Sequence, residues 1–163
     1  MLTQAELKSF VKYNSKTGIF TWLNPLSNRV KVGDVVGFKS NLYLATSILA
    51  KRHYLHRLAW LYMYGENPPQ FIDHINGIRS DNRILNLRLA SNLENNQNQK
   101  YPQSHNTSGF RGVHVRKDVV INKYGAKIKF KGKVTYLGHY KTLEEAYEVY
   151  LQAKRKLHPF NTL

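Results

Sequence analysis

Hydrophobic and polar positions change their spacing several times along this chain, which predicts short helices interleaved with short strands. Residues 3–13 place Leu7 and Val11 on one face of a helix. Thr3, followed three residues later by Glu6, has the spacing of a capping box at a helix start. We therefore expect a short amphipathic helix over residues 3–13.

The segments that follow are rich in strand-forming residues and are punctuated by glycines. Residues 19–23 and 42–49 are predicted strands. Residues 53–65 change from a strand-like to a helical spacing, so a strand should lead into a helix there. Pro68-Pro69 should end that helix.

Residues 71–99 combine two strand-like runs with a polar helix. The first predicted strand begins at residue 71 and the second covers 85–89, with a turn at Gly77 and a polar loop at 80–83 between them. A second capping-box pattern at 91–94 opens a helix that runs to about residue 99. This order predicts a ββα unit.

A polar stretch at 100–108 contains a proline and has no periodicity, so we interpret it as a linker. Three short strands are predicted beyond it, at 112–116, 125–131 and 134–140. Gly132 suits a tight hairpin, and a capped helix begins at Thr142. Apolar residues three and four apart in that helix predict that one face packs on the sheet.

The composition excludes several classes of protein. The chain has 163 residues, 42% of them hydrophobic, and no cysteine. Disulfides, thiol catalysis and cysteine-based structural zinc are therefore excluded. Neither a signal peptide nor an apolar run near the ~20 residues of a membrane span is present. We expect a soluble, cytoplasmic protein, located in the host cytoplasm or nucleoid if it is phage-encoded.

The charge points to a nucleic acid as the partner. The formal net charge is +15 and the sequence pI is about 10.0. Residues 1–99 carry twelve Lys and Arg against six acids, whereas 100–163 carry thirteen against four. The tail is thus the more basic part and should bind the phosphate backbone of the nucleic acid. An RNA-binding or ribosome-associated protein would also fit the charge.

The candidate chemistry lies in the ββα region. Asp73 and His74 are adjacent, and Asn86 and Asn95 follow twelve and twenty-one residues after the histidine. A carboxylate and amide oxygens can hold a hard divalent cation, and an imidazole can accept a proton from water near neutral pH. These groups suit metal-assisted hydrolysis of a phosphodiester. Neighbours on an ideal strand point to opposite faces, so convergence of Asp73 and His74 on one ion requires a bend.

Several short motifs in this region carry a family resemblance: Asp73-His74-Ile75-Asn76-Gly77, Asp81-Asn82-Arg83, Asn86-Leu87-Arg88 and Glu94-Asn95. On these residues the chain closely resembles the phage-type HNH endonucleases, which include homing nucleases. The resemblance extends upstream through Tyr54 to Trp60.

The resemblance implies a ββα-metal fold with one catalytic divalent cation, Mg²⁺ or alternatively Mn²⁺. Asp73 and Asn95 would be its ligands, and His74 would be the general base. Asn86 would orient His74 or hold the catalytic loop, and a purely structural role at a strand end is the alternative. Asn76, Asp81 and Asn82 are interpreted as turn builders, and His56 as a packing residue.

The tail carries a second resemblance, on Thr107-Ser108-Gly109-Phe110-Arg111-Gly112-Val113, Tyr136-Leu137-Gly138-His139-Tyr140 and Thr142-Leu143-Glu144-Glu145-Ala146. These residues resemble the plant ethylene-response-factor (Apetala-type) DNA-binding domain, which lays a three-stranded sheet in the major groove. Tyr124 and Tyr136 stand where that family usually has tryptophan. Arginine is suited to guanine edges and lysine to phosphates.

The residues expected to contact DNA are Arg111, Arg116, Lys127, Lys129, Lys133 and Tyr136 in the tail and Arg79 and Arg83 in the first half. Arg79 and Arg83, like Arg57 and Arg88, either bind phosphates or are solvated.

The sequence thus predicts an α+β protein with two parts. An HNH nuclease domain with a β-rich extension would cover 1–99, with its ββα-metal core at about 70–99. The linker at 100–108 would lead to a sheet-and-helix domain at 109–163. We expect a monomer that hydrolyses double-stranded DNA without a small-molecule cofactor or membrane association. The alternative is a non-catalytic, sequence-specific DNA-binding protein with the nuclease half as scaffold.

Overall fold

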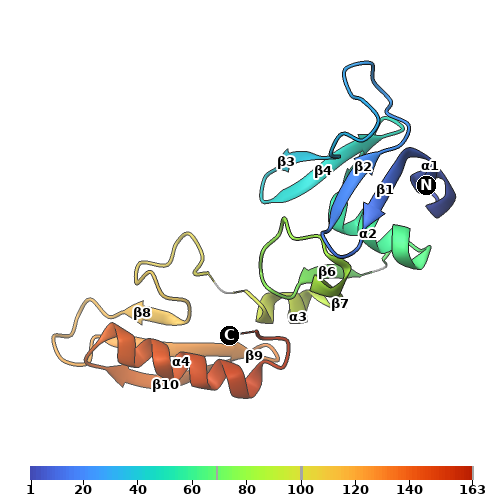
Figure 1. Cartoon of the computed structure of the whole chain (residues 1–163). Helices are drawn as coiled ribbons and strands as arrows, with labels where there is room; N and C mark the ends of the chain where they lie inside the picture. The colour runs from blue at the N-terminus through green and yellow to red at the C-terminus, as the bar shows by residue number, and fades with distance from the viewer. Residues whose placement is uncertain (69, 100, 163) are drawn as a thin grey trace. The chain divides into compact units, whose positions relative to one another are not determined.

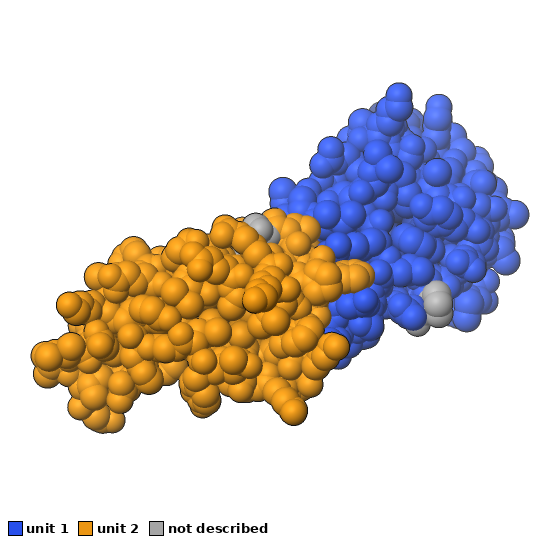
Figure 2. All heavy atoms as spheres, turned by 90° about the horizontal axis from the view of Figure 1, so that it is seen from below, with its two compact units in different colours: residues 1–95 blue, residues 96–163 orange. Residues whose placement is uncertain are grey.

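The computed structural model describes residues 1–68, 70–99 and 101–162. Pro69 of the predicted helix end, Lys100 of the predicted linker and Leu163 lie outside the described residues. The chain divides into two compact units, Met1–Asn95 and Asn96–Leu163 (Figure 2). The division falls four residues before the end of the nuclease domain expected from the sequence.

Unit 1 begins with the predicted capped helix. Helix α1 covers Gln4–Phe10, and Thr3 and Glu6 form both hydrogen bonds of the capping box. The helix ends earlier than expected because Val11 is extended and opens strand β1, Val11–Asn14. Strand β1 pairs antiparallel with β2, Ile19–Trp22, through a turn at Gly18.

A three-stranded antiparallel sheet and a helix follow. Strands β3 (Phe38–Ser40), β4 (Tyr43–Ile48) and β5 (Lys51–Tyr54) pair in sequence order. As the change of spacing predicted, β5 leads directly into α2, Leu55–Tyr64. That helix ends at Gly65, whose φ of 78° is the left-handed conformation that glycine adopts at helix ends.

The predicted ββα order is present in the motif region (Figure 1). Strand β6 covers Phe71–His74 and pairs antiparallel with β7, Leu87–Ala90. A single 3-10 turn, Ile84–Asn86, replaces the first residues of the predicted second strand. Helix α3 covers Asn92–Gln97. It begins with a reciprocal Ser91–Glu94 pair, in which Ser91 N and Oγ both donate to Glu94 Oε2 at 2.7 Å.

The core of unit 1 joins these elements. Its buried side chains come from the helices and from three of the strand pairs: Leu7, Val11, Phe20, Ile48, Leu55, Leu58, Ile72 and Leu87. Ile72 precedes Asp73 on β6, and Leu87 is the register partner of His74. The apolar residues of β6 and β7 therefore anchor the strand pair that carries the candidate chemistry.

Unit 2 contains the predicted sheet and helix. Strands β8 (Val113–Val115), β9 (Tyr124–Phe130) and β10 (Lys133–Tyr140) form an antiparallel sheet with β9 in the centre. Lys131 and Gly132 both have positive φ, 46° and 82°, in a two-residue turn between β9 and β10. Such turns match the right-handed twist of hairpin strands.

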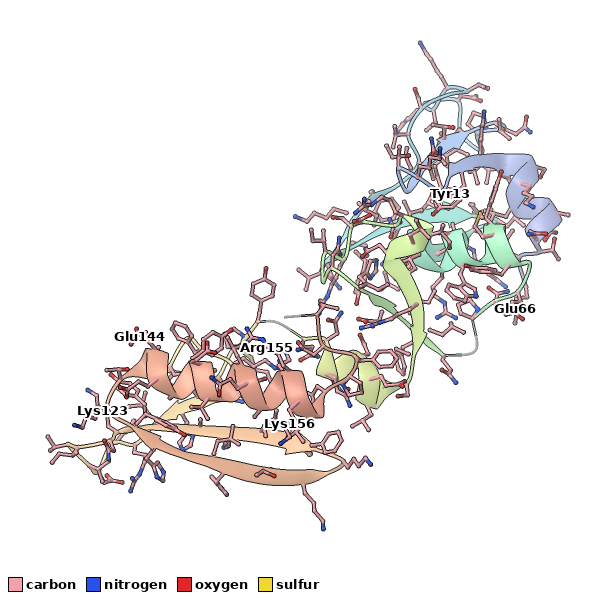
Figure 3. All side chains as sticks on the ribbon, turned by 60° about the horizontal axis from the view of Figure 1, so that its bottom comes forward. Tyr13, Glu66, Lys123, Glu144, Arg155 and Lys156 are labelled. Atoms are coloured by element: carbon pink, nitrogen blue, oxygen red, sulfur yellow. The ribbon has the colours of Figure 1, made fainter. Side chains whose placement is uncertain are left out.

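Helix α4, Leu143–Leu157, covers one face of this sheet. A small apolar core of Val113, Ala126 and Ala146 lies between them. Thr142 and Glu145 complete the predicted capping box. Figure 3 shows Glu144 in the first turn of α4 and Lys156 at its other end. This charge distribution complements the helix dipole.

The predicted α+β class is confirmed. Within the described residues, four small antiparallel sheets accompany four α-helices. None of the helices in that part of the chain is both long and apolar enough to span a bilayer.

Candidate functional site

Asp73 and His74 are both buried on strand β6, with 5% and 4% of their surfaces exposed. The strand pairs regularly through both, Asp73 with Arg88 and His74 with Leu87. The chain turns immediately after His74, next to Gly77. There Gly77 N donates to the His74 carbonyl at 2.8 Å, and the φ of Gly77 is 76°.

Arg88 is the partner of the Asp73 carboxylate. Its Nε donates to Asp73 Oδ2 at 2.9 Å, and its Nη2 lies 2.8 Å from the same oxygen. The Asp73 side chain is 6% exposed and that of Arg88 25%. A buried carboxylate is tolerated where a cation lies against it. The surroundings of this carboxylate therefore include a positive charge.

His74 lies in a group of rings and polar atoms. Its Nε2 is 3.5 Å from Asn82 Oδ1. The centre of its ring lies 5.2 Å from that of His56 and 6.0 Å from that of Tyr43. Burial lowers the pKa of His74, opposed by the Asn82 contact and by the charges of Asp73 and Asp81. The imidazole is therefore neutral near pH 7, the form that can accept a proton.

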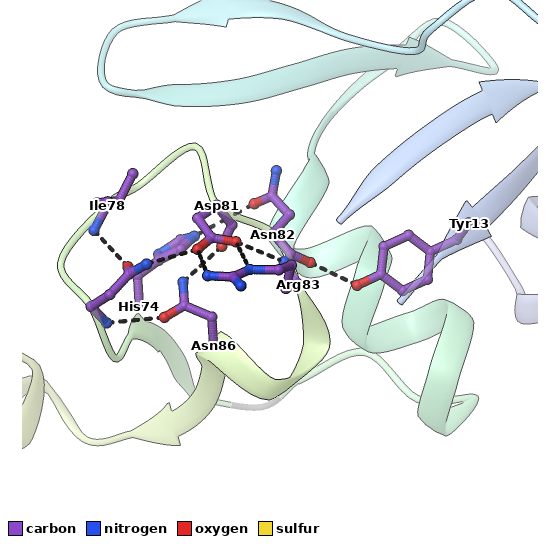
Figure 4. A network of polar contacts seen from close by, with 8 residues as sticks. Tyr13, His74, Ile78, Asp81, Asn82, Arg83 and Asn86 are labelled. Carbon is purple, nitrogen blue, oxygen red and sulfur yellow. Dashed lines mark hydrogen bonds and ion pairs between the residues drawn. The ribbon is translucent and has the colours of Figure 1, made fainter. Parts of the chain in front are cut away.

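Asn86 holds the loop between the two strands (Figure 4). Its Oδ1 accepts from Asn76 N at 2.9 Å, and its Nδ2 donates to the Asp81 carbonyl at 2.8 Å. Its own carbonyl accepts from Ile75 N at 2.9 Å. These bonds connect both ends of the loop to the start of β7. The roles expected of Asn86 in catalysis stay predictions.

Within this loop, Asp81 forms an exposed ion pair with Arg83. Arg83 Nε donates to Asp81 Oδ1 at 2.8 Å, and its Nη2 lies 2.6 Å from Oδ2. Asn76 Nδ2 also donates to Asp81 Oδ2, at 2.7 Å. The hydrogen bonds from Arg83 lower the pKa of Asp81 to about 2. Asn76 and Asp81 thus build the turn, as the sequence indicated.

The guanidinium of Arg79, the second arginine of the first half expected at DNA, lies 5.3 Å from the centre of the Tyr43 ring. Arginine stacks on aromatic faces in this way while its edge stays available for polar contacts. Arg79 also counts among the charges that lower the pKa of His74.

Asn95, the second expected metal ligand, is half-buried on α3. Its backbone nitrogen donates to the Ser91 carbonyl at 3.0 Å, so its place is set by the capped first turn. Among the described residues, no group of three or more His, Cys, Asp or Glu forms a metal cluster. A divalent cation at this site would therefore rely on one carboxylate together with amide or water oxygens.

The sheet of unit 2 has one face covered by α4 and one that carries basic and aromatic side chains. Lys127 and Lys129 on β9 are exposed and alternate with the buried Ala126 and Ile128. Tyr136, 71% exposed, is the register partner of Lys127. Lys127, Lys129 and Tyr136 therefore share the face away from the helix, and their contact with DNA stays a prediction.

Three other expected DNA contacts differ in their surroundings. Arg116 is exposed one residue beyond β8 and alternates onto the same face as Lys127. Lys133 pairs with Phe130 next to the turn, which places it on the opposite face of the sheet from Lys127. Arg111 points inward: its Nη1 donates to Gln99 Oε1 at 2.8 Å and to the Tyr101 carbonyl at 3.0 Å.

Sequence reasoning missed two residues beside the expected pair. Arg88 was interpreted as solvated or phosphate-binding and Asn82 as a turn builder, yet they contact Asp73 and His74 respectively. The register of β6 against β7 is the signal that would have found Arg88. The sequence contains no comparable local signal for Asn82.

Comparison with known proteins supports a nuclease. A family model described as HNH endonuclease matches residues 53–97, a stretch that includes Asp73, His74, Asn86 and Asn95. This domain indicates nuclease activity on DNA. No curated protein and no solved structure matched the chain. The matched stretch ends before the tail, so the likeness of the tail to ethylene-response-factor domains stays a prediction.

Proposed function

We propose that this protein is a metal-dependent DNA endonuclease in which His74 activates water for attack on a phosphodiester. One observation carries the proposal: an adjacent acid and imidazole, both at least 95% buried, lie on a strand inside the stretch that matches HNH endonucleases. Burial of polar side chains costs free energy unless hydrogen bonds, ion pairs or a bound cation offset it.

His74 serves as the general base in this proposal. Because burial lowers its pKa, the imidazole is neutral at physiological pH and can take a proton from water. The surrounding rings of His56 and Tyr43 fill the space beside it. They restrict its rotation, which favours a single orientation of the base.

The donor set fits a hard divalent cation. Asp73 and Asn95 would hold it through a carboxylate and an amide oxygen, which suit Mg²⁺ and Mn²⁺ better than soft metals. The Arg88 guanidinium against Asp73 supports this fit because it shows that the carboxylate accommodates a positive charge. A bound cation would stabilise the negative charge that develops on the phosphate and the leaving oxygen.

Asn86 would act on the geometry of the site. Its bonds to Asn76 and Asp81 hold the loop that follows His74, and the 3-10 turn places it at the start of β7. Loss of these bonds would loosen the loop without removing any reacting group.

The tail would bind the duplex. Lys127, Lys129 and Tyr136 on the exposed face of the sheet suit phosphates and sugar surfaces, and Arg116 suits a guanine edge. Arg111 and Lys133 are less favoured as DNA contacts. Arg111 forms hydrogen bonds within the unit, and Lys133 lies on the opposite face of the sheet from Lys127. From the resemblance of residues 71–99 to phage-type HNH endonucleases, we infer that the protein is a homing-type nuclease of a phage or mobile element.

Plasmid cleavage tests the proposal. Supercoiled DNA incubated with the full chain and Mg²⁺ or Mn²⁺ should become nicked or linear, and EDTA should abolish the reaction. Binding of the same DNA in EDTA without any cleavage on adding either metal would favour the non-catalytic DNA-binding protein. Tighter binding of RNA than of duplex DNA, again without cleavage, would favour the RNA-binding class.

A further inference from the structure

Asn82 is a buried residue next to the candidate base, and the roles proposed above do not use it. Only 2% of its surface is exposed, although it lies in the polar loop that follows His74. Its Oδ1 is 3.5 Å from His74 Nε2. Turn-building asparagines are usually exposed and bond to their own backbone. Burial of this one against an imidazole indicates a different role.

The β1–β2 hairpin holds Asn82 in place from outside the loop (Figure 4). Tyr13 Oη donates to the Asn82 carbonyl at 2.6 Å, in a contact that spans 69 residues of sequence. Burial raises the pKa of Tyr13 to about 12, so its hydroxyl keeps the proton that it donates. Ile84 N donates to the Ser15 carbonyl at 3.3 Å, two residues further along the loop.

Gly18 permits this close approach. Its φ is +74°, and a Cβ added there would lie 2.5 Å from the backbone nitrogen of Arg83 and 2.7 Å from the carbonyl carbon of Asn82. Any side chain would push the hairpin away from the loop. Three hairpin positions thus contact the loop around Asn82.

We propose that Asn82 is a positioning residue for His74, and that the β1–β2 hairpin braces it in that role. Asn82 Oδ1 accepts the Nε2–H of the neutral imidazole. This selects the tautomer whose basic lone pair lies on Nδ1, the nitrogen that would take the proton from water. In metal and triad sites a second residue fixes the imidazole in the same way. The inference rests on the proposed role of His74 as the base.

The tautomer can be measured without metal, substrate or turnover. In the full chain, ¹⁵N-labelled at histidine and kept in EDTA, the imidazole nitrogen shifts of His74 would be assigned by their loss in His74→Gln. We expect a protonated Nε2 and an unprotonated Nδ1. A protonated Nδ1 would overturn the proposal, because the amide would then present Nδ2 to the ring.

Variants of Asn82 separate positioning from folding. Asn82→Ala should shift the His74 Nε2 resonance and lower kcat by about 10- to 100-fold with little change in KM, the range for loss of an orienting partner. Asn82→Asp keeps an acceptor oxygen, so it should retain the Nε2–H tautomer and recover part of kcat. Tyr13→Phe, which removes only the hydroxyl, should show a smaller loss of the same kind.

Asn28→Ala, in an exposed loop, is the matched control and should change neither the spectrum nor kcat. An Asn82→Ala protein with wild-type His74 shifts would contradict the positioning role, whatever its activity. The expected tautomer in a chain that cuts no DNA would instead contradict His74 as a base. The two failures are therefore distinguishable.

Discussion

Arg88 lies directly opposite Asp73 in the β6–β7 register, and two of its nitrogens contact the same carboxylate oxygen, at 2.9 and 2.8 Å. A proposed metal ligand is thus neutralised by a side chain of the neighbouring strand. A divalent cation at Asp73 would compete with this guanidinium. A displaced guanidinium would be suited to bind a phosphate oxygen.

Arg88→Gln should therefore raise Mn²⁺ affinity while it lowers stability in EDTA. It removes the guanidinium that lies against a buried carboxylate, and loss of one member of a buried ion pair costs about 3–5 kcal/mol. Added Mn²⁺ should recover part of that loss, because it supplies the missing positive charge. Calorimetric titration with Mn²⁺ and thermal melts with and without the metal would measure both effects.

Arg83→Gln is the matched control because it breaks the exposed pair with Asp81, in which the Arg83 side chain is 51% exposed. The loss of unfolding free energy in this variant should be under about 1 kcal/mol, and added Mn²⁺ should not change it. Equal losses in both variants, or weaker Mn²⁺ binding by Arg88→Gln, would refute competition at Asp73.

His74→Ala should lower the cleavage rate by about 10²–10⁴-fold or more, the range for loss of a general base. DNA affinity should stay unchanged because the basic groups are untouched. Initial rates on supercoiled plasmid together with gel-shift titrations would establish both. His105→Ala, at an exposed position of the tail, should cut at the wild-type rate. Wild-type cleavage by His74→Ala would exclude the imidazole as the base.

Acid should destabilise unit 1 through His56. Burial, followed by the charges of His74 and Arg57, lowers the pKa of His56 to about 3 from an unfolded value near 6.5. Below pH 6.5 the unfolded chain binds a proton that the folded chain excludes. The contribution of neutral His56 to the free energy of unfolding is therefore fully present above pH 6.5. It falls by about 1.4 kcal/mol per pH unit as the pH drops toward 3.

His56→Phe should flatten this dependence, since a phenyl ring has no proton to bind. Denaturant unfolding of the variant and the wild type at pH 7, 6, 5 and 4 would show the difference in slope. The exposed His105→Phe should keep the wild-type slope. Parallel curves for wild type and His56→Phe would show that the buried imidazole does not contribute.

Residues 96–163 should fold alone and bind duplex DNA. Inside this unit Lys154 Nζ donates to the Gln99 carbonyl at 2.8 Å, and Arg111 bonds to Gln99 and Tyr101. A fragment that begins at residue 106 lacks these partners and should melt at a lower temperature. DNA affinity of the longer fragment should fall with salt at a log–log slope near −0.9 per phosphate contacted. No binding at low salt would remove the tail from DNA recognition.

Arg116→Ala should reduce DNA affinity, whereas Arg111→Ala should reduce stability. Arg116 is exposed on the proposed DNA face, so its loss should cost about 1–3 kcal/mol on the specific site and flatten discrimination there. Arg111 bonds inward, so its loss should chiefly lower the melting temperature of unit 2. Lys127→Ala should weaken binding to all sequences and reduce the salt slope by about one.

Competition against random duplex would separate these cases. If the Arg116 variant lost equal affinity for specific and random DNA, the tail would bind DNA only through non-specific charge interactions with phosphates. Selectivity would then reside in the nuclease half.

Elements with signals close in sequence were predictable. The caps of α1 and α4 depend on pairs three residues apart, Thr3–Glu6 and Thr142–Glu145, and both form as expected. The turn between β9 and β10 depends on Gly132 and its neighbour. The ββα order could also be derived from spacing. The resemblance to HNH endonucleases rests on motifs in the same short segment, within the matched residues 53–97.

The partners of the candidate catalytic residues were not predictable in this way. Arg88 reaches Asp73 only through strand register, and Asn82 reaches His74 only because the loop folds back. The hydroxyl that fixes Asn82 belongs to Tyr13, 69 residues earlier. Spacing along a chain specifies local backbone geometry and the faces of single elements. Contacts between distant segments depend on how those elements pack, so only the tertiary structure determined the surroundings of His74.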